Sequence, residues 1–141
     1  MSNELTNTEI KKICDKHNIS INGIYCKDQL PKILIKGWYI INLDNAKGEG
    51  THWCCFHYGK ENLYFDSYGF PSPEQVEDRI TPYKYNHKQI QNINASTCGY
   101  YCIACIKCCE RGTLIEFNKF INYFSKDTTI NDRILQIILF H

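Results

Sequence analysis

The segment that follows Gln89 changes abruptly in character, and this change constrains the whole fold. Up to Cys98 the segment is polar and rich in turn-forming residues, and beyond it the pattern is apolar and contains no Pro. This pattern predicts a helix over residues 99–111, buried on most of its surface, with Gly112 as its end cap. Because such a helix needs other elements around it, we expect the remainder of the chain to be arranged around this stretch.

Cys98 lies at the start of the expected helix, which gives its thiol a particular electrostatic environment. The first turn of a helix presents unpaired backbone N–H groups and the positive end of the helix dipole, and both favour a thiolate. A nucleophilic thiolate also requires a base and a group that orients the base. Two segments supply candidates: Gly50-Thr-His-Trp53 contains His52, and Phe65-Asp-Ser-Tyr-Gly69 contains Asp66.

The composition describes a globular protein. A chain of 141 residues suffices for one core and is too short for two ordinary domains, so residues 1–141 are expected to form a single domain. An apolar content of 43% and a net charge of +1 give no electrostatic support for a nucleic-acid or membrane partner. No apolar run approaches the roughly 18 residues of a membrane span, and the first residues lack the features of a signal peptide. We therefore expect a protein that is not secreted and stays in a reducing compartment.

The nine cysteines are open to three interpretations: disulfides, a metal site or thiol chemistry. An odd number without a secretory signal argues against a complete disulfide framework. The spacing Cys98-x3-Cys102-x2-Cys105 is that of radical iron–sulfur enzymes, and Cys108 and Cys109 add further thiols, so an iron–sulfur or zinc protein is one alternative. Helical periodicity argues against it, because positions 98, 102, 105 and 109 share one helix face that is predicted to be core. We expect no metal and no cofactor.

Capping motifs and turn residues predict the other elements. Thr6-Asn-Thr-Glu9 and Thr113-Leu-Ile-Glu116 are capping boxes, and Ser72-Pro-Glu-Gln75 is a further candidate for the same motif. The predicted helices span residues 7–17, 73–80, 99–111, 113–124 and 130–140. The predicted strands span residues 37–43, 52–58, 62–66 and 83–86, and residues 24–31 are expected to be irregular.

The strands over residues 52–58 and 62–66 are joined by Gly59-Lys-Glu61, which indicates a β-hairpin. His52 at the start of one strand and Asp66 at the end of the other then lie at the same end of the sheet, within side-chain reach. A carboxylate in this place can accept the second ring N–H of a histidine base and fix its tautomer.

Attack of a thiolate on a carbonyl group also creates an oxyanion, which needs hydrogen-bond donors already aimed at it. The backbone N–H of Cys98 and the side-chain amide of Gln91 can supply two such donors. Gln89, Asn92 and Asn94 compete with Gln91 for the amide role. The residues alone do not separate these candidates.

Three motifs of this chain follow one another in the order Gly50-Thr-His-Trp53, Phe65-Asp-Ser-Tyr-Gly69 and Gln91-x6-Cys98-Gly99. In identity and in order they resemble the motifs of the adenovirus-type cysteine endopeptidases (adenain). The wider clan includes the SUMO-specific and related ubiquitin-like-protein proteases. The resemblance extends from about residue 37 to residue 109. The run Trp38-Tyr-Ile-Ile-Asn-Leu-Asp44 before the histidine is similar to such proteases from DNA viruses, including virophages and polinton-like elements. It implies that His52 is the base, Asp66 its orienter, Gln91 the oxyanion donor and Cys98 the nucleophile. Adenovirus enzymes have Glu at the position of Asp66, whereas Asp is common in the rest of the clan.

The resemblance implies an α+β fold, with a papain-like cysteine protease core in adenain-like chain order and a small mixed β-sheet packed against the helix that bears Cys98. It implies an endopeptidase that hydrolyses peptide bonds through a Cys98 thioester, matures viral capsid or other structural precursors and cuts after small residues such as Gly. The implied location is the host cytoplasm, a virus factory or the virion interior. Adenovirus enzymes use a peptide and DNA as activators. A peptide partner stays open for this chain, and its near-neutral charge argues against DNA.

Two other functions stay open on the same fold. One is a deubiquitinase or deSUMOylase-like protease of the same clan, which would also favour Gly before the scissile bond. The other is a scaffold or binding module without catalysis. The shortness of the chain, at 141 residues, favours the viral branch over the first alternative.

Overall fold

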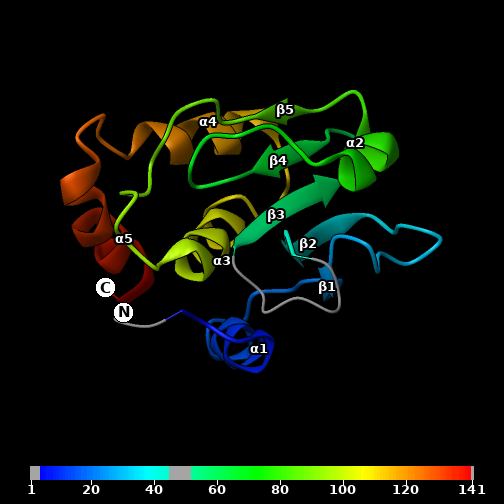
Figure 1. The fold of residues 1–141 in the computed structure, drawn as a ribbon, viewed down its shortest axis with the longest axis horizontal. Coiled ribbons are helices and arrows are strands. Elements are labelled where there is room, and N and C mark those ends of the chain that lie inside the picture. Colours follow the sequence, from blue (N-terminus) through cyan, green and yellow to red (C-terminus); the bar gives the residue numbers. More distant parts are fainter. Residues whose placement is uncertain (1–3, 45–51, 141) are drawn as a thin grey trace.

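The computed structural model describes residues 4–44 and 52–140. Its strands form one mixed sheet in the order β1-β2-β3-β4-β5, as Figure 1 shows. The strands are β1 (Gly23–Cys26), β2 (Gly37–Asn42), β3 (Trp53–Tyr58), β4 (Leu63–Phe65) and β5 (Lys84–Tyr85). The helices are α1 (Asn7–Lys16), α2 (Glu74–Ile80), α3 (Cys98–Cys108), α4 (Leu114–Asn122) and α5 (Asn131–Phe140), and a short 3-10 helix, η1 (Thr128–Ile130), precedes α5. Residues 46–50 contain two glycines, a composition that predicts a loop, and they lie outside the described residues.

The sheet combines antiparallel and parallel pairs. β2, β3 and β4 run antiparallel to one another, whereas β1 is parallel to β2 and β5 is parallel to β4. The β3–β4 pair, with Cys55 opposite Phe65, is the hairpin predicted from Gly59-Lys-Glu61. The expected α+β fold with a small mixed sheet is therefore confirmed.

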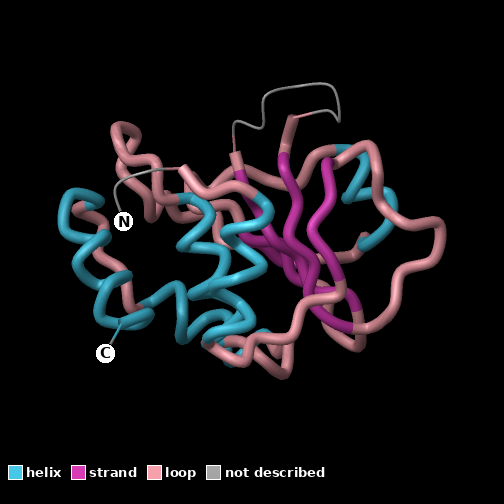
Figure 2. Tube along the Cα trace, turned by 90° about the horizontal axis from the view of Figure 1, so that it is seen from below, coloured by secondary structure: helices cyan, strands magenta, loops and turns pink. Residues whose placement is uncertain are grey.

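Helix α3 is the centre of the core. It packs against β3 and is contacted by α1, α4 and α5, which together cover one face of the sheet (Figures 1 and 2). Cys102, Cys105 and Cys109 have no exposed surface, in agreement with the predicted core face. On the other face of the sheet, Val76 and Ile80 of α2 pack against buried side chains of β2, β3 and β4. The predicted buried helix thus organises the larger of two core regions.

Two of the three predicted capping boxes are present. The side chains of Thr6 and Thr113 each accept a backbone N–H three residues later, and a glutamate reaches back to the backbone N–H of the threonine. The prediction for Ser72 is wrong, because α2 begins after Pro73 and the Ser72 hydroxyl donates to the Pro73 carbonyl instead. Proline at this cap position already supplies the extended backbone from which a helix starts.

Two predicted boundaries also differ from the structure. Residues 24–31 were expected to be irregular, but β1 occupies the start of this segment, where Ile24 pairs with Ile40 of β2. This edge strand depends on its neighbour rather than on a local pattern. Helix α3 ends at Cys108 instead of residue 111, and Gly112 lies beyond the helix in a turn, with a φ of 65°.

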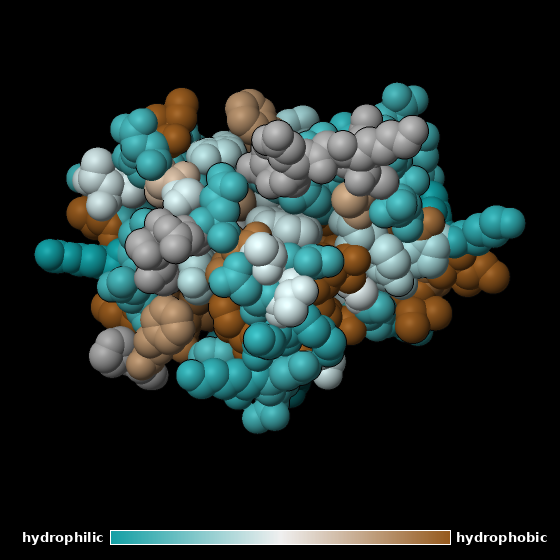
Figure 3. Space-filling model, turned by 60° about the horizontal axis from the view of Figure 1, so that its bottom comes forward, coloured by the Kyte–Doolittle hydropathy of each residue, from teal (hydrophilic) through white to brown (hydrophobic). Residues whose placement is uncertain are grey.

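The nine cysteines are all free thiols, as the odd count indicates for most of them. On the face shown in Figure 3, hydrophobic side chains form separate groups among hydrophilic ones. Within the described residues, the helices are too short or too polar for any of them to cross a membrane.

Candidate active site

Cys98 is the first residue of α3, so its thiol lies at the N-terminal end of the helix. The first N–H groups of a helix have no partner within it, and the thiol therefore lies in a positive field. The preceding residue, Thr97, donates its hydroxyl to Asp132 of α5 at 3.1 Å, and the same carboxylate oxygen accepts the Tyr101 hydroxyl at 2.8 Å. Helix α5 thereby fixes the start of α3.

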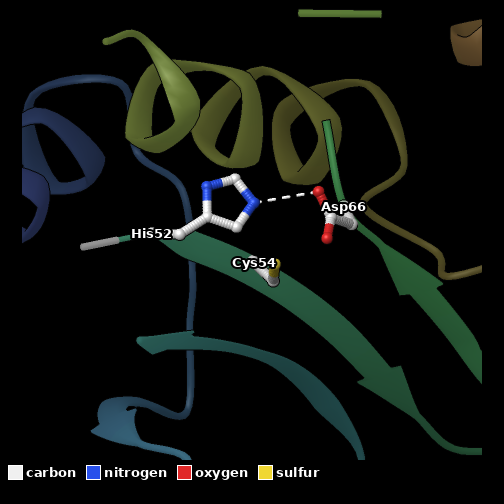
Figure 4. A group of neighbouring side chains, drawn as sticks. All are labelled: His52, Cys54 and Asp66. Atoms are coloured by element: carbon white, nitrogen blue, oxygen red, sulfur yellow. Dashed lines mark hydrogen bonds and ion pairs between the residues drawn. The ribbon is translucent and has the colours of Figure 1, made fainter. Parts of the chain in front are cut away.

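His52 and Asp66 flank the β3–β4 hairpin, as the sequence predicts. His52 directly precedes β3, and Asp66 directly follows β4. His52 Nε2 lies 2.9 Å from Asp66 Oδ1, and Figure 4 shows the two side chains pointing toward each other. The Asp66 side chain is 1% exposed and the His52 side chain 14%, so the contact is shielded from water while the imidazole keeps some access to solvent.

The other ring nitrogen of His52 points toward α3 (Figure 4), and the Cys98 thiol interacts with the imidazole. The backbone N–H of Trp53 donates to Cys98 Sγ at 3.4 Å. Burial alone would lower the pKa of the His52 imidazole. Hydrogen bonds with Asp66, Cys54 and Cys98 outweigh this effect and raise the pKa to about 12. The imidazole is therefore protonated near neutral pH and can pair with a thiolate.

The chain around Asp66 is held by side-chain and backbone hydrogen bonds. Asn86 accepts the Asp66 N–H at 3.2 Å and donates to the Asp66 carbonyl at 2.7 Å. The Tyr68 N–H donates to Asp66 Oδ1 at 2.8 Å, and the Gly69 N–H donates to the Asp66 carbonyl at 2.8 Å. Gly69 has a φ of 84°, and a Cβ there would lie 2.8 Å from the His87 carbonyl oxygen, so this turn requires glycine.

Tyr68 and Asn86 are site residues that the sequence reasoning missed. The Tyr68 ring stacks on the His52 imidazole, with ring centroids 4.8 Å apart and an interplanar angle of 25°. Tyr68 lies in the same motif as Asp66, Phe65-Asp-Ser-Tyr-Gly69, and this motif is the signal for it. Asn86 follows Asp66 by 20 residues and has no local pattern that could reveal the contact.

Gln91 is fully buried and its amide has a fixed orientation. The Ser67 hydroxyl donates to Gln91 Oε1 at 2.6 Å, and Gln91 Nε2 donates to the Ala95 carbonyl at 2.8 Å. An amide nitrogen carries two hydrogens, so Nε2 has a second donor besides the one directed to Ala95. The amide nitrogen is thus directed toward the segment that leads to Cys98.

The other amides considered for this role are arranged differently. Gln89 is exposed, and its amide donates to the backbone carbonyl of Gln91 at 3.1 Å. The Asn92 amide donates to the Thr128 hydroxyl at 3.2 Å, and Asn94 is exposed. Of the four candidates, Gln91 is the one with a buried amide held by a neighbouring side chain.

Cys54 is a second thiol at this site, and the sequence reasoning did not identify it. It is fully buried, and its sulfur, a His52 ring nitrogen and an Asp66 oxygen lie within 4.8 Å of one another (Figure 4). Burial raises the pKa of the Cys54 thiol to about 12. Tyr64 packs in the same buried cluster as Cys54, and burial raises the pKa of its hydroxyl. This buried hydroxyl has no hydrogen-bond partner in the described part of the chain.

The cysteines of α3 do not present a comparable cluster. Within residues 4–44 and 52–140, the group of His52, Cys54 and Asp66 is the one set of three potential metal ligands that converge. An iron–sulfur cluster requires thiolates that can surround the iron, whereas Cys102 and Cys105 are enclosed in the core. The arrangement therefore does not fit the iron–sulfur alternative.

The sequence matches no known protein-family model and no curated protein. The structure resembles two crystal structures of the ASFV pS273R protease, one of them the selenomethionine form, with TM-scores of 0.56 and 0.54 and 16% sequence identity in each case. Each comparison covers 99% of this chain and 68% of that protease chain. The chain therefore has the fold of this protease, and its chemistry must be argued from its own site.

Proposed function

We propose that this protein is a cysteine endopeptidase that cleaves peptide bonds through a thioester on Cys98. The proposal depends on one observation: the His52 imidazole contacts Asp66 at 2.9 Å, and the backbone N–H of the next residue, Trp53, donates to Cys98 Sγ at 3.4 Å, so the thiol lies beside the histidine segment. Nucleophilic cysteine catalysis requires this combination of thiol, base and orienting group. The fold shared with the ASFV pS273R protease supports the same conclusion.

The proposed reaction has two steps. In the first, the Cys98 thiolate attacks the carbonyl carbon, the C–N bond breaks, and the His52 imidazolium gives its proton to the leaving amine. In the second, His52 takes a proton from a water molecule that attacks the thioester, and the Cys98 thiolate leaves. Asp66 stays ionised throughout, orients the imidazole and stabilises its protonated form.

Gln91 is proposed as the oxyanion donor in both steps. The second hydrogen on Gln91 Nε2 and the backbone N–H of Cys98, in the first turn of α3, would donate to the developing negative charge. Ser67 supports this role because its hydroxyl occupies the amide oxygen of Gln91 and so fixes which end of the amide is the donor.

The proposed substrates are protein precursors, including viral structural polyproteins, cut after small residues such as Gly. Space around the nucleophile is restricted, since Cys98 is only 5% exposed. Gly99 lies against Leu5 and Trp53, and an added Cβ at Gly99 would be 3.2 Å from a methyl group of Leu5. A small residue before the scissile bond suits such a confined site, and the fold shared with the ASFV pS273R protease supports a viral role.

A covalent probe tests the proposal directly. A peptide that ends in a glycine with a thiol-reactive vinyl sulfone should form a single adduct, mapped to Cys98 by mass spectrometry, and the Cys98→Ala variant should form none. Precursor peptides with Gly before the scissile bond should be cleaved by the unmodified protein alone. Absence of both adduct and cleavage would reject the proposal. Reaction with ubiquitin-like vinyl sulfones alone would favour the deubiquitinase or deSUMOylase alternative.

A further inference from the structure

We propose that His52, Cys54 and Asp66 form a Zn²⁺ site whose occupation switches off the His52–Asp66 pair. One nitrogen, one sulfur and one oxygen from these residues lie within 4.8 Å of one another, and Figure 4 shows the three side chains converging. Imidazole, thiolate and carboxylate are the protein ligands of Zn²⁺, and three of them plus one open position is a common coordination.

The hairpin explains why these side chains converge. Residues two apart on a strand point to the same face, so His52 and Cys54 share one side of β3. Cys55 of β3 is paired with Phe65 of β4 in the antiparallel register. In such a pair the residue before Cys55 faces the residue after Phe65, so Cys54 lies beside Asp66. Zn²⁺ bonds of about 2.0–2.3 Å place its ligands about 3–4 Å apart. The observed group therefore needs only small side-chain adjustments to hold the ion.

The surroundings supply a polar partner for an ion at this position. The Tyr64 side chain packs in the same buried cluster as Cys54, and its hydroxyl makes no hydrogen bond of ordinary geometry among the described residues. A water molecule in the open coordination position could bond to this hydroxyl, as second-shell groups commonly do. Binding of Zn²⁺ would release to solvent the proton of the Cys54 thiol and the proton shared between His52 and Asp66.

Occupation would have a direct consequence for catalysis. The ion would bind His52 through Nε2, which now contacts Asp66, and would therefore replace the contact that orients the imidazole. The other ring nitrogen points toward α3, so Cys98 stays outside the ligand set (Figure 4). This inhibitory consequence rests on the proposed function, whereas metal binding itself does not.

Metal binding can be tested without any enzyme activity. Co²⁺ is added to the 141-residue Cys98→Ala protein, in which the nucleophile cannot act as a ligand. We expect a thiolate-to-cobalt charge-transfer band and tetrahedral visible bands that saturate at one equivalent. Adding Cys54→Ser or Cys54→Ala should abolish the charge-transfer band, and adding Asp66→Asn should weaken cobalt binding at least ~10-fold.

Cys55→Ser is the matched control. Cys55 is the next residue of β3 and is equally buried, but it belongs to the core region on the α3 side of the sheet. The Cys55→Ser variant in the same background should keep the band. A band that survives both Cys54 substitutions, or that Cys55→Ser removes equally, overturns the site. X-ray absorption of the zinc-loaded Cys98→Ala protein needs no Cys54 variant: one sulfur ligand supports the site, and none overturns it.

The switch is tested separately by zinc titration of cleavage. The Cys54→Ser enzyme should need at least ~10-fold more Zn²⁺ for half inhibition than the unmodified protein, and a chelator should restore activity in the latter. Equal zinc sensitivity of the two proteins would place the inhibitory metal on Cys98 and overturn the switch. If no peptide is cleaved at all, the proposed function fails, while the cobalt result still decides the metal site.

Discussion

His52 Nε2 and Asp66 Oδ1 lie 2.9 Å apart although 14 positions separate the two residues in the chain. The β3–β4 hairpin brings them together, and its register decides which side chains meet at this end of the sheet. A slip of one residue would move every side chain of a strand to the opposite face. The pair therefore depends on the register of the hairpin as well as on the identity of its two members.

Asp66→Asn should lower turnover by on the order of 10²-fold or more, with a smaller effect on KM, because the amide orients the ring without stabilising the imidazolium. Asp66 helps to raise the pKa of His52 to about 12. Without this carboxylate the pKa of His52 falls, so the imidazole loses the proton needed by the leaving group at a lower pH. The alkaline limit of activity should therefore move to lower pH in the variant. Pre-steady-state kinetics across pH measure this. Unchanged turnover with a raised KM would place Asp66 in substrate binding.

The same pair should contribute to stability with a defined pH dependence. The folded-state pKa of His52, about 12, exceeds the ordinary value of about 6.5, so the stabilisation is complete below the ordinary value and declines as pH rises toward 12. The difference in unfolding free energy between the unmodified protein and Asp66→Asn should therefore shrink from pH 6 to pH 10. Urea unfolding at several pH values measures it. A difference that grows with pH contradicts the assignment.

Cys98 should be the thiol that is alkylated fastest near neutral pH. Its neighbours are a protonated imidazole and the helix start, whereas burial raises the pKa of Cys14 to about 11 and that of Cys54 to about 12. Timed labelling with iodoacetamide and peptide mapping give the order of modification. Cys98→Ala should abolish cleavage and stay folded, and Cys108→Ala, at a half-buried position near the far end of α3, should keep activity. Uniform labelling of several cysteines would count against the nucleophile.

The elements that could be predicted from the sequence are those with strong local patterns. The apolar run after Cys98 and the capping boxes at Thr6 and Thr113 identify helices because the necessary contacts lie within a few residues. Strand β1 was missed because its hydrogen bonds depend on β2, which lies farther along the chain. The Ser72 box failed because a matching residue pattern does not fix which residue caps the helix.

The site shows the same division between local and distant information. Motif order indicated His52, Asp66 and Cys98, and the structure brings these three together. Cys54 was overlooked because a buried cysteine on a strand is ordinarily a small hydrophobic residue, and only the hairpin register places it beside Asp66. Contacts of this kind depend on pairing between strands, which the sequence pattern does not specify.

Asn86→Ala should destabilise the protein by about 1–3 kcal/mol, because it leaves the buried N–H of Asp66 without its partner. It also removes one of two hydrogen bonds to the Asp66 carbonyl, which keeps the one from the Gly69 N–H. It should also reduce turnover, and the alkaline limit of activity should move toward that of Asp66→Asn. Thermal unfolding and pH–rate profiles measure the two effects. Asn94→Ala is the control, since Asn94 is exposed. Loss of stability with an unchanged pH profile would make Asn86 a purely structural residue.

Gln91→Ala should lower turnover by roughly 10²-fold or more while the alkylation rate of Cys98 stays nearly unchanged, because an oxyanion donor acts mainly in the transition state. Gln89→Ala, two residues away and exposed, should be close to silent. Ser67→Ala should fall between them, since it frees the Gln91 amide oxygen but keeps the donor. Single-turnover cleavage and alkylation are measured on all three variants. A large loss at Gln89 with little at Gln91 reverses the assignment, and a parallel loss of alkylation in Gln91→Ala would mean that Gln91 supports the thiolate instead of the oxyanion.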